Sequence, residues 1–445
     1  METEKIRFSE KLGYGFGEMA GTLHLTAIST FLTFFYTDVV GISAAAVGTL
    51  LLVARVFDGF VDIGIGTLID KTKSKYGKAR PWLLWLAIPF GIASVLLFTA
   101  PDLGPTGALA YAYATYLIIN ILYSGINIPY GVMNSLITQD GYQRSLLNIF
   151  RMLIGLTGTL IVTTMTLPLV EAFGGGKGGW LGTFTIFGSA SVILIFISFR
   201  STKERVKPSV VNKKIPLKRS VKALFRNKYW IMMLLVMTCY GISSAAGAGV
   251  NVFYAQYILH NKDLVSLFGA LSLIPLVLGL LVIAPVIKKY GKRNTAIIGL
   301  IISIVGCAIL IMDPANLPIV LASIVIRSIG MVPVAASGYA MLADTIDYGE
   351  WKTGIRSEGL VYSAGSFGGK VGNGIGAALV GWLLAIGGYV GGQATISASA
   401  SASIQFMFIY LPIIFNVILL IVLIPYKLDK EYPQIIEDLN SVKCA

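Results

Sequence analysis

The residues best suited to chemistry are three charged side chains within an apolar stretch that begins at Leu51. Arg55, Asp58 and Asp62 interrupt LLVARVFDGFVDIGIG, which otherwise has the composition of a membrane helix. A charge at bilayer depth costs about 2.5–3.5 kcal/mol on insertion scales and normally faces a partner or a water-filled cavity. Residues four apart lie on one face of a helix, so both carboxylates point the same way, with Arg55 one turn before Asp58.

Two carboxylates held together in low dielectric repel each other unless a cation or a proton arrives. Asp58 and Asp62 are therefore suited to binding a coupling ion, either H⁺ or Na⁺, and would be the ligands of a sodium ion. The alternative is a structural role as salt-bridged or snorkelling charges. Two acids one turn apart near the middle of an apolar helix favour the ion-binding interpretation.

The composition of the chain indicates a polytopic membrane protein. Of its 445 residues, 55% are hydrophobic and 13% are charged, and the mean hydropathy is +0.77. Soluble globular chains carry about 25% charged residues. The three cysteines, Cys239, Cys307 and Cys444, are far apart and show no metal-binding or redox spacing, so we expect no cofactor beyond the coupling ion.

Apolar runs long enough to cross about 30 Å of hydrocarbon predict the helices. We therefore expect an all-α membrane protein with twelve transmembrane helices and the major facilitator fold in two six-helix halves. The approximate limits of the helices are 12–37, 44–68, 82–100, 106–137, 146–170, 179–199, 229–259, 265–287, 295–313, 317–342, 359–389 and 403–425.

Basic residues gather in the loops on one side of the predicted membrane. They crowd loops 70–81 and 288–294, and the stretch 200–228 holds eleven basic residues against one acid. The other side has only Lys177 and Lys262. By the positive-inside rule, both termini and the long middle loop are cytoplasmic. The net charge of +13 therefore reflects topology, and we expect no nucleic-acid partner.

A short repeat divides the chain in two. The tetrapeptide KYGK follows the second predicted helix at 75–78 and the eighth at 289–292. Its matched location indicates parallel repeats. We expect an N-terminal six-helix bundle at 1–199, a basic cytoplasmic linker at 200–228, a C-terminal six-helix bundle at 229–426 and a cytoplasmic tail at 427–445.

The fourth predicted helix contains hydroxyl, amide and aromatic groups close together. Tyr123, Ser124, Asn127 and Tyr130 occur in LYSGINIPYGVMN. Such groups suit a sugar, which presents several hydroxyls and an apolar ring face. The alternative is hydrogen bonding between helices, which is common for polar side chains in membranes.

Further charged residues lie within other predicted helices. Arg151 is deep enough to require a partner, for which we expect Asp58 or Asp62. Lys370, the only charge in the eleventh helix, would complete this charge network or contact the substrate.

Three other polar residues are harder to interpret. Glu18 in the first helix is either interfacial or functional. His24 is better explained by packing than as a ligand. Arg327 in the tenth helix has no acid near it in sequence and receives no role.

With these residues identified, the chain resembles the glycoside–pentoside–hexuronide:cation symporters, a branch of the major facilitator superfamily that includes melibiose, xyloside and glucuronide carriers. The resemblance spans nearly the whole chain. It implies alternating access and sugar uptake driven by a sodium or proton gradient across the inner (plasma) membrane. The matching segments are FYTDVVG at 35–41, ARVFDGFVD at 54–62, KYGKARPW at 75–82, NIPYG at 127–131, RSLLNIFR at 144–151, ADTIDYGEWKTGIRSEG at 343–359 and the region around Lys370.

The resemblance implies roles for individual residues. Asp58 and Asp62 match the cation-site carboxylates of the family, and Ser124 falls where melibiose carriers have a threonine near the cation. Arg151 and Lys370 match the charged partners of that site, to which Arg55 is added by its spacing. The substrate-binding residues that we expect are Glu18, Thr22, Tyr123, Asn127, Tyr130, Arg151 and Lys370.

Departures from the melibiose carriers limit the resemblance. Val61 replaces an asparagine that supplies an oxygen next to the second carboxylate, which favours a proton over sodium. Asn127 and Thr22 replace two sugar-binding aspartates, and Gly131 replaces an aromatic residue. The segment NIPYG is more similar to the glucuronide and xyloside carriers, so we do not expect a melibiose carrier.

Two other classes of function were weighed against sugar symport. A lipid or lysolipid carrier of the same fold would need a lipid-wide cleft, whereas the fourth helix is polar and the loops are short. An enzyme or receptor is not expected, because the sequence shows no metal-ligand cluster, activated nucleophile or soluble catalytic domain.

Overall fold

The computed structural model describes residues 6–138, 140–206, 222–354, 358–393 and 395–444. Within these ranges the regular structure is helical and no strand occurs. Eleven of the described helices are long and apolar enough to cross a membrane. The predicted first span falls on a twelfth helix, α1 (Phe8–Ala27), which continues through the π-helical turns Ile28–Leu32 and Phe35–Val40. The prediction of an all-α membrane protein is confirmed, and these eleven helices together with α1 agree with the predicted count of twelve in the part of the chain that the structure describes.

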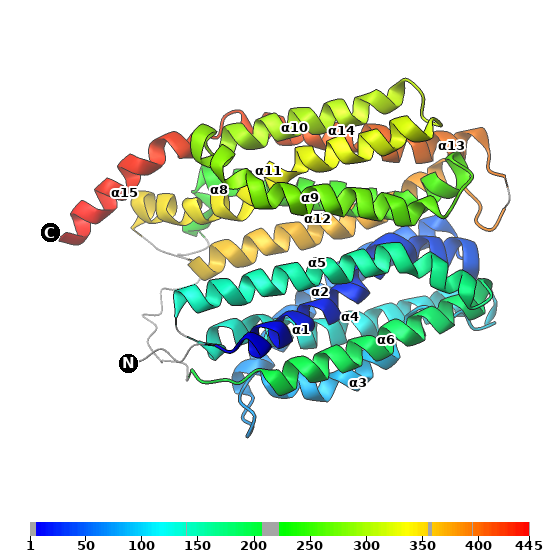
Figure 1. Ribbon diagram of the computed structural model, residues 1–445, viewed down its shortest axis with the longest axis horizontal. Helices are drawn as coiled ribbons and strands as arrows, with labels where there is room; N and C mark the ends of the chain where they lie inside the picture. Colours follow the sequence, from blue (N-terminus) through cyan, green and yellow to red (C-terminus); the bar gives the residue numbers. More distant parts are fainter. Residues whose placement is uncertain (1–5, 139, 207–221, 355–357, 394, 445) are drawn as a thin grey trace. The chain divides into compact units, whose positions relative to one another are not determined.

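The chain forms two compact units, the first of which comprises Met1–Val210 with the short segments Lys262–Gly269 and Leu384–Ser397. Here α1 packs against α5 and α6, α3 against α4 and α6, and α2 against α4 (Figure 1). Gly41, with φ 84°, ends the first span, and Ser43 then caps the next helix. After α1, the helices of this unit are α2 (Ala44–Lys71), α3 (Arg80–Leu97), α4 (Gly104–Ile137), α5 (Gly141–Ala172) and α6 (Gly176–Ser201).

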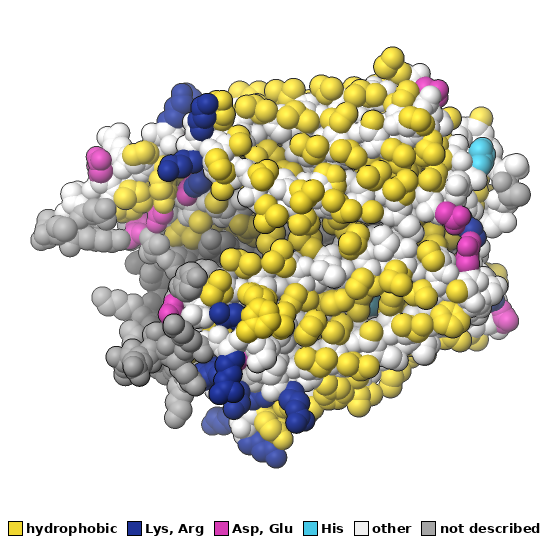
Figure 2. All heavy atoms as spheres, in the orientation of Figure 1, with side chains coloured by type: hydrophobic (Ala, Val, Ile, Leu, Met, Phe, Trp, Pro, Cys, Tyr) yellow, Lys and Arg dark blue, Asp and Glu magenta, His cyan; other side chains and the backbone are white. Residues whose placement is uncertain are grey.

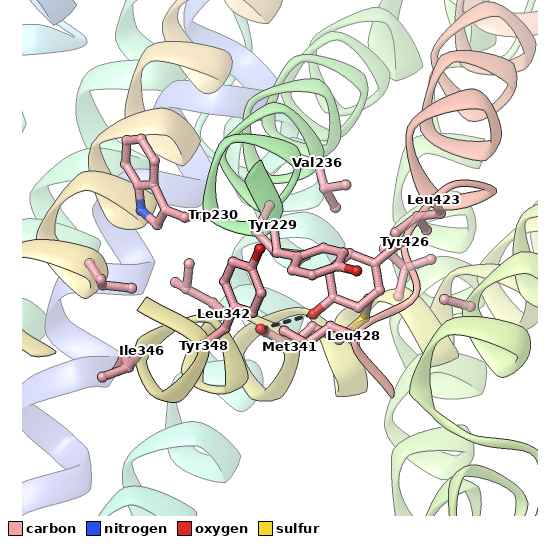
Figure 3. Packing of buried hydrophobic residues seen from close by; sticks show 14 of the residues in the cluster. Tyr229, Trp230, Val236, Met341, Leu342, Ile346, Tyr348, Leu423, Tyr426 and Leu428 are labelled. Atoms are coloured by element: carbon pink, nitrogen blue, oxygen red, sulfur yellow. Dashed lines mark hydrogen bonds between the residues drawn. The ribbon is translucent and has the colours of Figure 1, made fainter. Parts of the chain in front are cut away.

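The second unit has its own buried core, centred on aromatic side chains. Tyr229, Tyr348 and Tyr426 meet edge to face within this core (Figure 3). The Tyr426 hydroxyl donates a hydrogen bond of 3.3 Å to the carbonyl of Met341. The helices that contribute to the second unit are α8 (Lys228–Phe253), α9 (Leu264–Tyr290), α10 (Lys292–Ala308), α11 (Leu317–Thr353), α12 (Glu358–Ile386), α13 (Ala398–Gln405), α14 (Leu411–Leu423) and α15 (Leu428–Cys444).

Apolar and basic side chains occupy different parts of the surface of each unit. Figure 2 shows an apolar covering along the helices of each unit, with most Lys and Arg side chains gathered at one end of them. The predicted tail 427–445 contains the helix α15. Residues 207–221 of the predicted linker and 355–357 of the matching segment 343–359 lie outside the described residues. The predicted domain boundaries remain predictions.

A helix follows the repeated KYGK motif in each unit, and in both units an acidic side chain accepts one or more hydrogen bonds from backbone N–H groups at the start of that helix. Glu204, just after α6, accepts hydrogen bonds from the backbone N–H groups of Lys78, Ala79 and Arg80 at 2.8, 2.8 and 2.9 Å. These N–H groups lie at the start of α3, where a helix leaves its donors unpaired. In the other unit, Asp429 accepts from the N–H of Arg293 at 2.8 Å, at the start of α10.

An arginine shortly after each motif binds the end of a different helix. Arg80 donates to the carbonyl of Phe199 in α6 at 2.6 Å, and Arg293 donates to the carbonyl of Leu423 in α14 at 3.0 Å. The last carbonyls of a helix lack partners within that helix. In each unit, therefore, the motif joins the start of one helix to the end of another.

We expect Glu204→Ala to destabilise the protein, because it removes the acceptor of three backbone N–H groups. A hydrogen bond to a charged group contributes about 1.5–3 kcal/mol. Because each kcal/mol shifts the melting temperature of a unit of this size by about 2–4 °C, loss of three such bonds should lower it in detergent by about 9 °C or more, with Glu204→Gln intermediate. Asp102→Asn is the matched control, because it removes only an exposed ion pair with Lys177, which contributes little. Equal melting temperatures for Glu204→Ala and the control would contradict this role.

Candidate functional site

The structure brings together two of the residues predicted to bind the coupling ion, Asp58 and Ser124, and one residue of the predicted charge network, Arg55. Ser124 on α4 donates a hydrogen bond of 2.9 Å to Oδ1 of Asp58 on α2. Arg55, one turn earlier on α2, lies with Nη1 3.9 Å from the other oxygen, Oδ2. Asp58 and Ser124 are only 2% and 1% exposed. A buried carboxylate thus has a hydroxyl donor and a cation beside it.

Asp62 follows one turn after Asp58 on the same helix and is partly buried. Both acids act electrostatically on Arg55, as do the phenol of Tyr116, which is buried, and that of Tyr123, which is partly buried. Asp58, Arg55 and Ser124 therefore form one cluster between α2 and α4, and Asp62 lies one helical turn further along α2. Whether a cation binds there remains a prediction.

Arg151 on α5 forms its ion pair with Glu18 on α1. The distance between Arg151 Nε and Glu18 Oε2 is 2.6 Å. We had expected Asp58 or Asp62 as the partner, and the structure provides Glu18 instead. The guanidinium also lies over the ring of Tyr130, 5.2 Å from its centroid.

Two glycines on α5 explain why Glu18 reaches Arg151. A Cβ atom at Gly155, one turn after Arg151, would lie 2.8 Å from Cγ of Glu18. A Cβ at Gly158 would lie 2.6 Å from the hydroxyl of Thr22. Small residues let membrane helices approach closely, so these glycines bring α1 against α5. The combination of R-x-x-x-G-x-x-G on α5 with E-x-x-x-T on α1 is the sequence signal that could have predicted the pair.

Thr22 lies in the same contact between α1 and α5. Its hydroxyl donates to the carbonyl of Gly155 at 3.1 Å and to that of Met19 at 3.0 Å. Here the hydroxyl binds backbone carbonyls. The role of Thr22 in substrate binding remains a prediction.

Tyr130 is fixed by a second tyrosine that the sequence analysis did not identify. The rings of Tyr14 and Tyr130 are stacked with centroids 4.7 Å apart. The Tyr130 hydroxyl donates to the carbonyl of Tyr14 at 2.6 Å. Because both rings are buried, the face of Tyr130 toward Arg151 has a fixed orientation.

A small cavity in the first unit contains four of the predicted substrate-binding residues. Glu18, Tyr123, Asn127 and Tyr130 line it, together with apolar residues and glycines. One carboxylate, one amide and two phenols therefore surround a space walled by aliphatic and aromatic groups. Such a mixture can bind a sugar, since hydroxyls need polar partners and the ring faces need apolar ones.

The remaining predicted residues lie elsewhere. Lys370 is on α12 in the second unit and is partly buried; its place in the charge network remains a prediction. His24 is 3% exposed, with Nδ1 3.3 Å from the Ser94 hydroxyl and its ring edge to face with Phe90, as expected for a packing histidine. In the second unit, Arg327 lies over the ring of Phe408, 4.4 Å from the centroid.

Comparison with known proteins places these features in a family. Residues 13–430 match the family model described as MFS/sugar transport protein. The chain is 39% identical to the isoprimeverose transporter of Lactiplantibacillus pentosus, over 98% of this chain and 92% of that protein. It is 31% identical to the putative glycoside/cation symporter YagG of Escherichia coli (strain K12), over 95% and 93%.

Solved structures show the same fold at low sequence identity. The nucleoside transporter NupG superposes with a TM-score of 0.64 at 14% identity, covering 95% of this chain and all of that one. A bacterial homologue of the human lysosomal transporter Spinster superposes with a TM-score of 0.65 at 14% identity, over 94% of this chain and 95% of that one.

Proposed function

Because the chain belongs to the MFS/sugar transport protein family, we propose that it moves a glycoside across the plasma membrane together with a coupling cation. The family match and the named relatives confirm the predicted transporter fold, the resemblance to glycoside–cation symporters and the expectation that the chain is not an enzyme. They do not support the lipid-carrier alternative. The cytoplasmic location of both termini is part of the proposal.

The contact between Ser124 and Asp58 is the observation that best supports coupling to a cation. A buried carboxylate with a hydroxyl 2.9 Å away, and a second acid one turn later, offers oxygen atoms from two helices to H⁺ or Na⁺. In this proposal Asp58, Asp62 and Ser124 offer oxygen atoms to the ion, and Arg55 orients the carboxylate of Asp58. Lys370 is the further member proposed for this charge network, whereas Arg151 is paired with Glu18.

The charge of the acids explains how ion and sugar are coupled. Moving a carboxylate through a low-dielectric region costs less free energy once a proton or cation has neutralised its charge. The loaded carrier can therefore change between outward-open and inward-open states more readily than the carrier that holds sugar alone. A ligand shifts such an equilibrium only through its different affinity for the two states.

The substrate that we propose first is a small glycoside of the isoprimeverose type, for which the relative at 39% identity is named. The cavity residues Glu18, Tyr123, Asn127 and Tyr130, with Thr22, Arg151 and Lys370, would bind its hydroxyls and ring face. Sugars commonly need several polar partners and at least one apolar surface in such a site.

Counterflow in proteoliposomes tests the proposal. Vesicles preloaded with unlabelled isoprimeverose should accumulate labelled isoprimeverose transiently, and protein-free vesicles should not. A panel with other glycosides, a hexuronide and a lysolipid identifies the class that competes. Counterflow with the lysolipid and with no sugar of the panel would contradict the proposed function.

A further inference from the structure

The charge balance of the cavity that we propose as part of the sugar site follows from the ion pair between Arg151 and Glu18. Arg151 Nε lies 2.6 Å from Glu18 Oε2, and the two side chains are 31% and 24% exposed. Glu18 also lines the cavity, along with the uncharged Tyr123, Asn127 and Tyr130. The positive charge of Arg151 is therefore already balanced by a carboxylate that faces the same space.

The packing of α1 on α5 holds this pair in place. Gly155 admits the Glu18 side chain, because a Cβ there would lie 2.8 Å from Cγ of Glu18. On the other side, the guanidinium lies 5.2 Å from the centroid of the Tyr130 ring, and that ring is fixed by its hydrogen bond of 2.6 Å to Tyr14. A substrate carboxylate that approached Arg151 would therefore meet the Glu18 carboxylate, which already accepts a hydrogen bond from Nε of Arg151.

We propose that Glu18 makes this site select uncharged glycosides over hexuronides and other anionic sugars, which rests on the proposed function. Sugar hydroxyls can donate hydrogen bonds to the Glu18 carboxylate, whereas an anionic group in the cavity meets a like charge in a low-dielectric setting. Specificity of this kind comes from a repulsive element as well as from attractive contacts. Glu18 is thus a specificity-determining residue.

Two ligands that differ only at one carbon test this selection. Methyl β-D-glucoside carries a hydroxymethyl group where methyl β-D-glucuronide carries a carboxylate. Binding of each to the purified protein, or competition of each against labelled isoprimeverose, gives an affinity ratio. We expect the wild-type protein to favour the neutral ligand by about tenfold or more.

Glu18→Gln should lower this ratio by about tenfold or more, because Arg151 loses its counter-charge and becomes available to the carboxylate of the glucuronide. Glu18→Asp retains the charge and should retain the preference for the neutral ligand. Asp102→Asn, which removes an exposed carboxylate in the same unit, is the control and should leave the ratio unchanged.

The double variant Glu18→Gln/Arg151→Gln serves if the single variant fails to fold, because it leaves no unpaired charge from this pair. It removes the repulsion by the Glu18 carboxylate without exposing the Arg151 cation. Its preference for the neutral ligand should therefore be weaker than that of the wild type and stronger than that of Glu18→Gln.

The outcomes separate the inference from the proposed function. A wild-type preference for the glucuronide, or an unchanged ratio in a folded Glu18→Gln protein or in the double variant, would overturn the role of Glu18 and leave sugar transport intact. Failure of the wild-type protein to bind any glycoside of the panel would overturn the proposed function, and the inference with it.

Discussion

Replacing Asp58 or Asp62 with asparagine is expected to abolish gradient-driven accumulation of sugar while energy-independent exchange survives. A neutral carboxamide neither binds a proton near neutral pH nor offers a negative charge to a cation. Coupling should therefore fail before sugar recognition does. In Asp58→Asn the new carboxamide keeps an oxygen that can accept the hydrogen bond that Ser124 gives to Asp58 at 2.9 Å. The local contact between α2 and α4 should therefore persist, and loss of accumulation would then report the missing charge.

The measurement compares two assays on the same proteoliposomes. Accumulation against a concentration gradient should fall to the level of protein-free vesicles, while counterflow of labelled sugar should continue. Asp102→Asn, which alters an exposed acid of the same unit, should behave as the wild type in both assays. Accumulation at the wild-type level in both variants would show that neither carboxylate carries the coupling ion.

The sequence predicted the cluster around Asp58 because its geometry is local. The spacing of Arg55, Asp58 and Asp62 on one helix fixes their common face, and only one contact, with Ser124, had to come from another helix. That contact was supplied by the resemblance to a known family. The structure brings Ser124 and Asp58 within hydrogen-bonding distance.

The partner of Arg151 could not be predicted in the same way, because it depends on which helices touch. Spacing along α5 says nothing about α1. The approach of these two helices is set by Gly155 and Gly158, whose missing side chains leave room for Glu18 and Thr22. In the sequence, Asp58, Asp62 and Glu18 were all available acids, and only the packing selects Glu18.

The cap formed by Glu204 shows the same dependence on packing. In the sequence, KYGK indicates a repeat and the stretch 200–228 indicates a basic linker. The single acid of that stretch binds three N–H groups at the start of α3. The only sequence signal for these hydrogen bonds was that Glu204 is the one acid among eleven basic residues.

A proton, rather than sodium, is expected to drive transport. Sodium is a hard cation that favours several oxygen ligands, by analogy with other hard metal ions. The resemblance to melibiose carriers implies that Val61 withdraws one such oxygen, while Asp58, Asp62 and Ser124 remain. A proton needs one buried carboxylate near a like charge, and Asp58, which is 2% exposed, lies one helical turn from Asp62.

Uptake into de-energised proteoliposomes, with one imposed ion gradient at a time, shows whether a proton or sodium drives transport. We expect accumulation with an inward proton gradient in sodium-free buffer, and its collapse when a protonophore is added. Val61→Asn restores the missing amide oxygen and should add a response to sodium if the ligand count is what limits sodium binding. Accumulation by the wild-type protein with inward sodium at clamped pH, and none with an inward proton gradient, would mean that water or a backbone carbonyl replaces the oxygen that Val61 lacks.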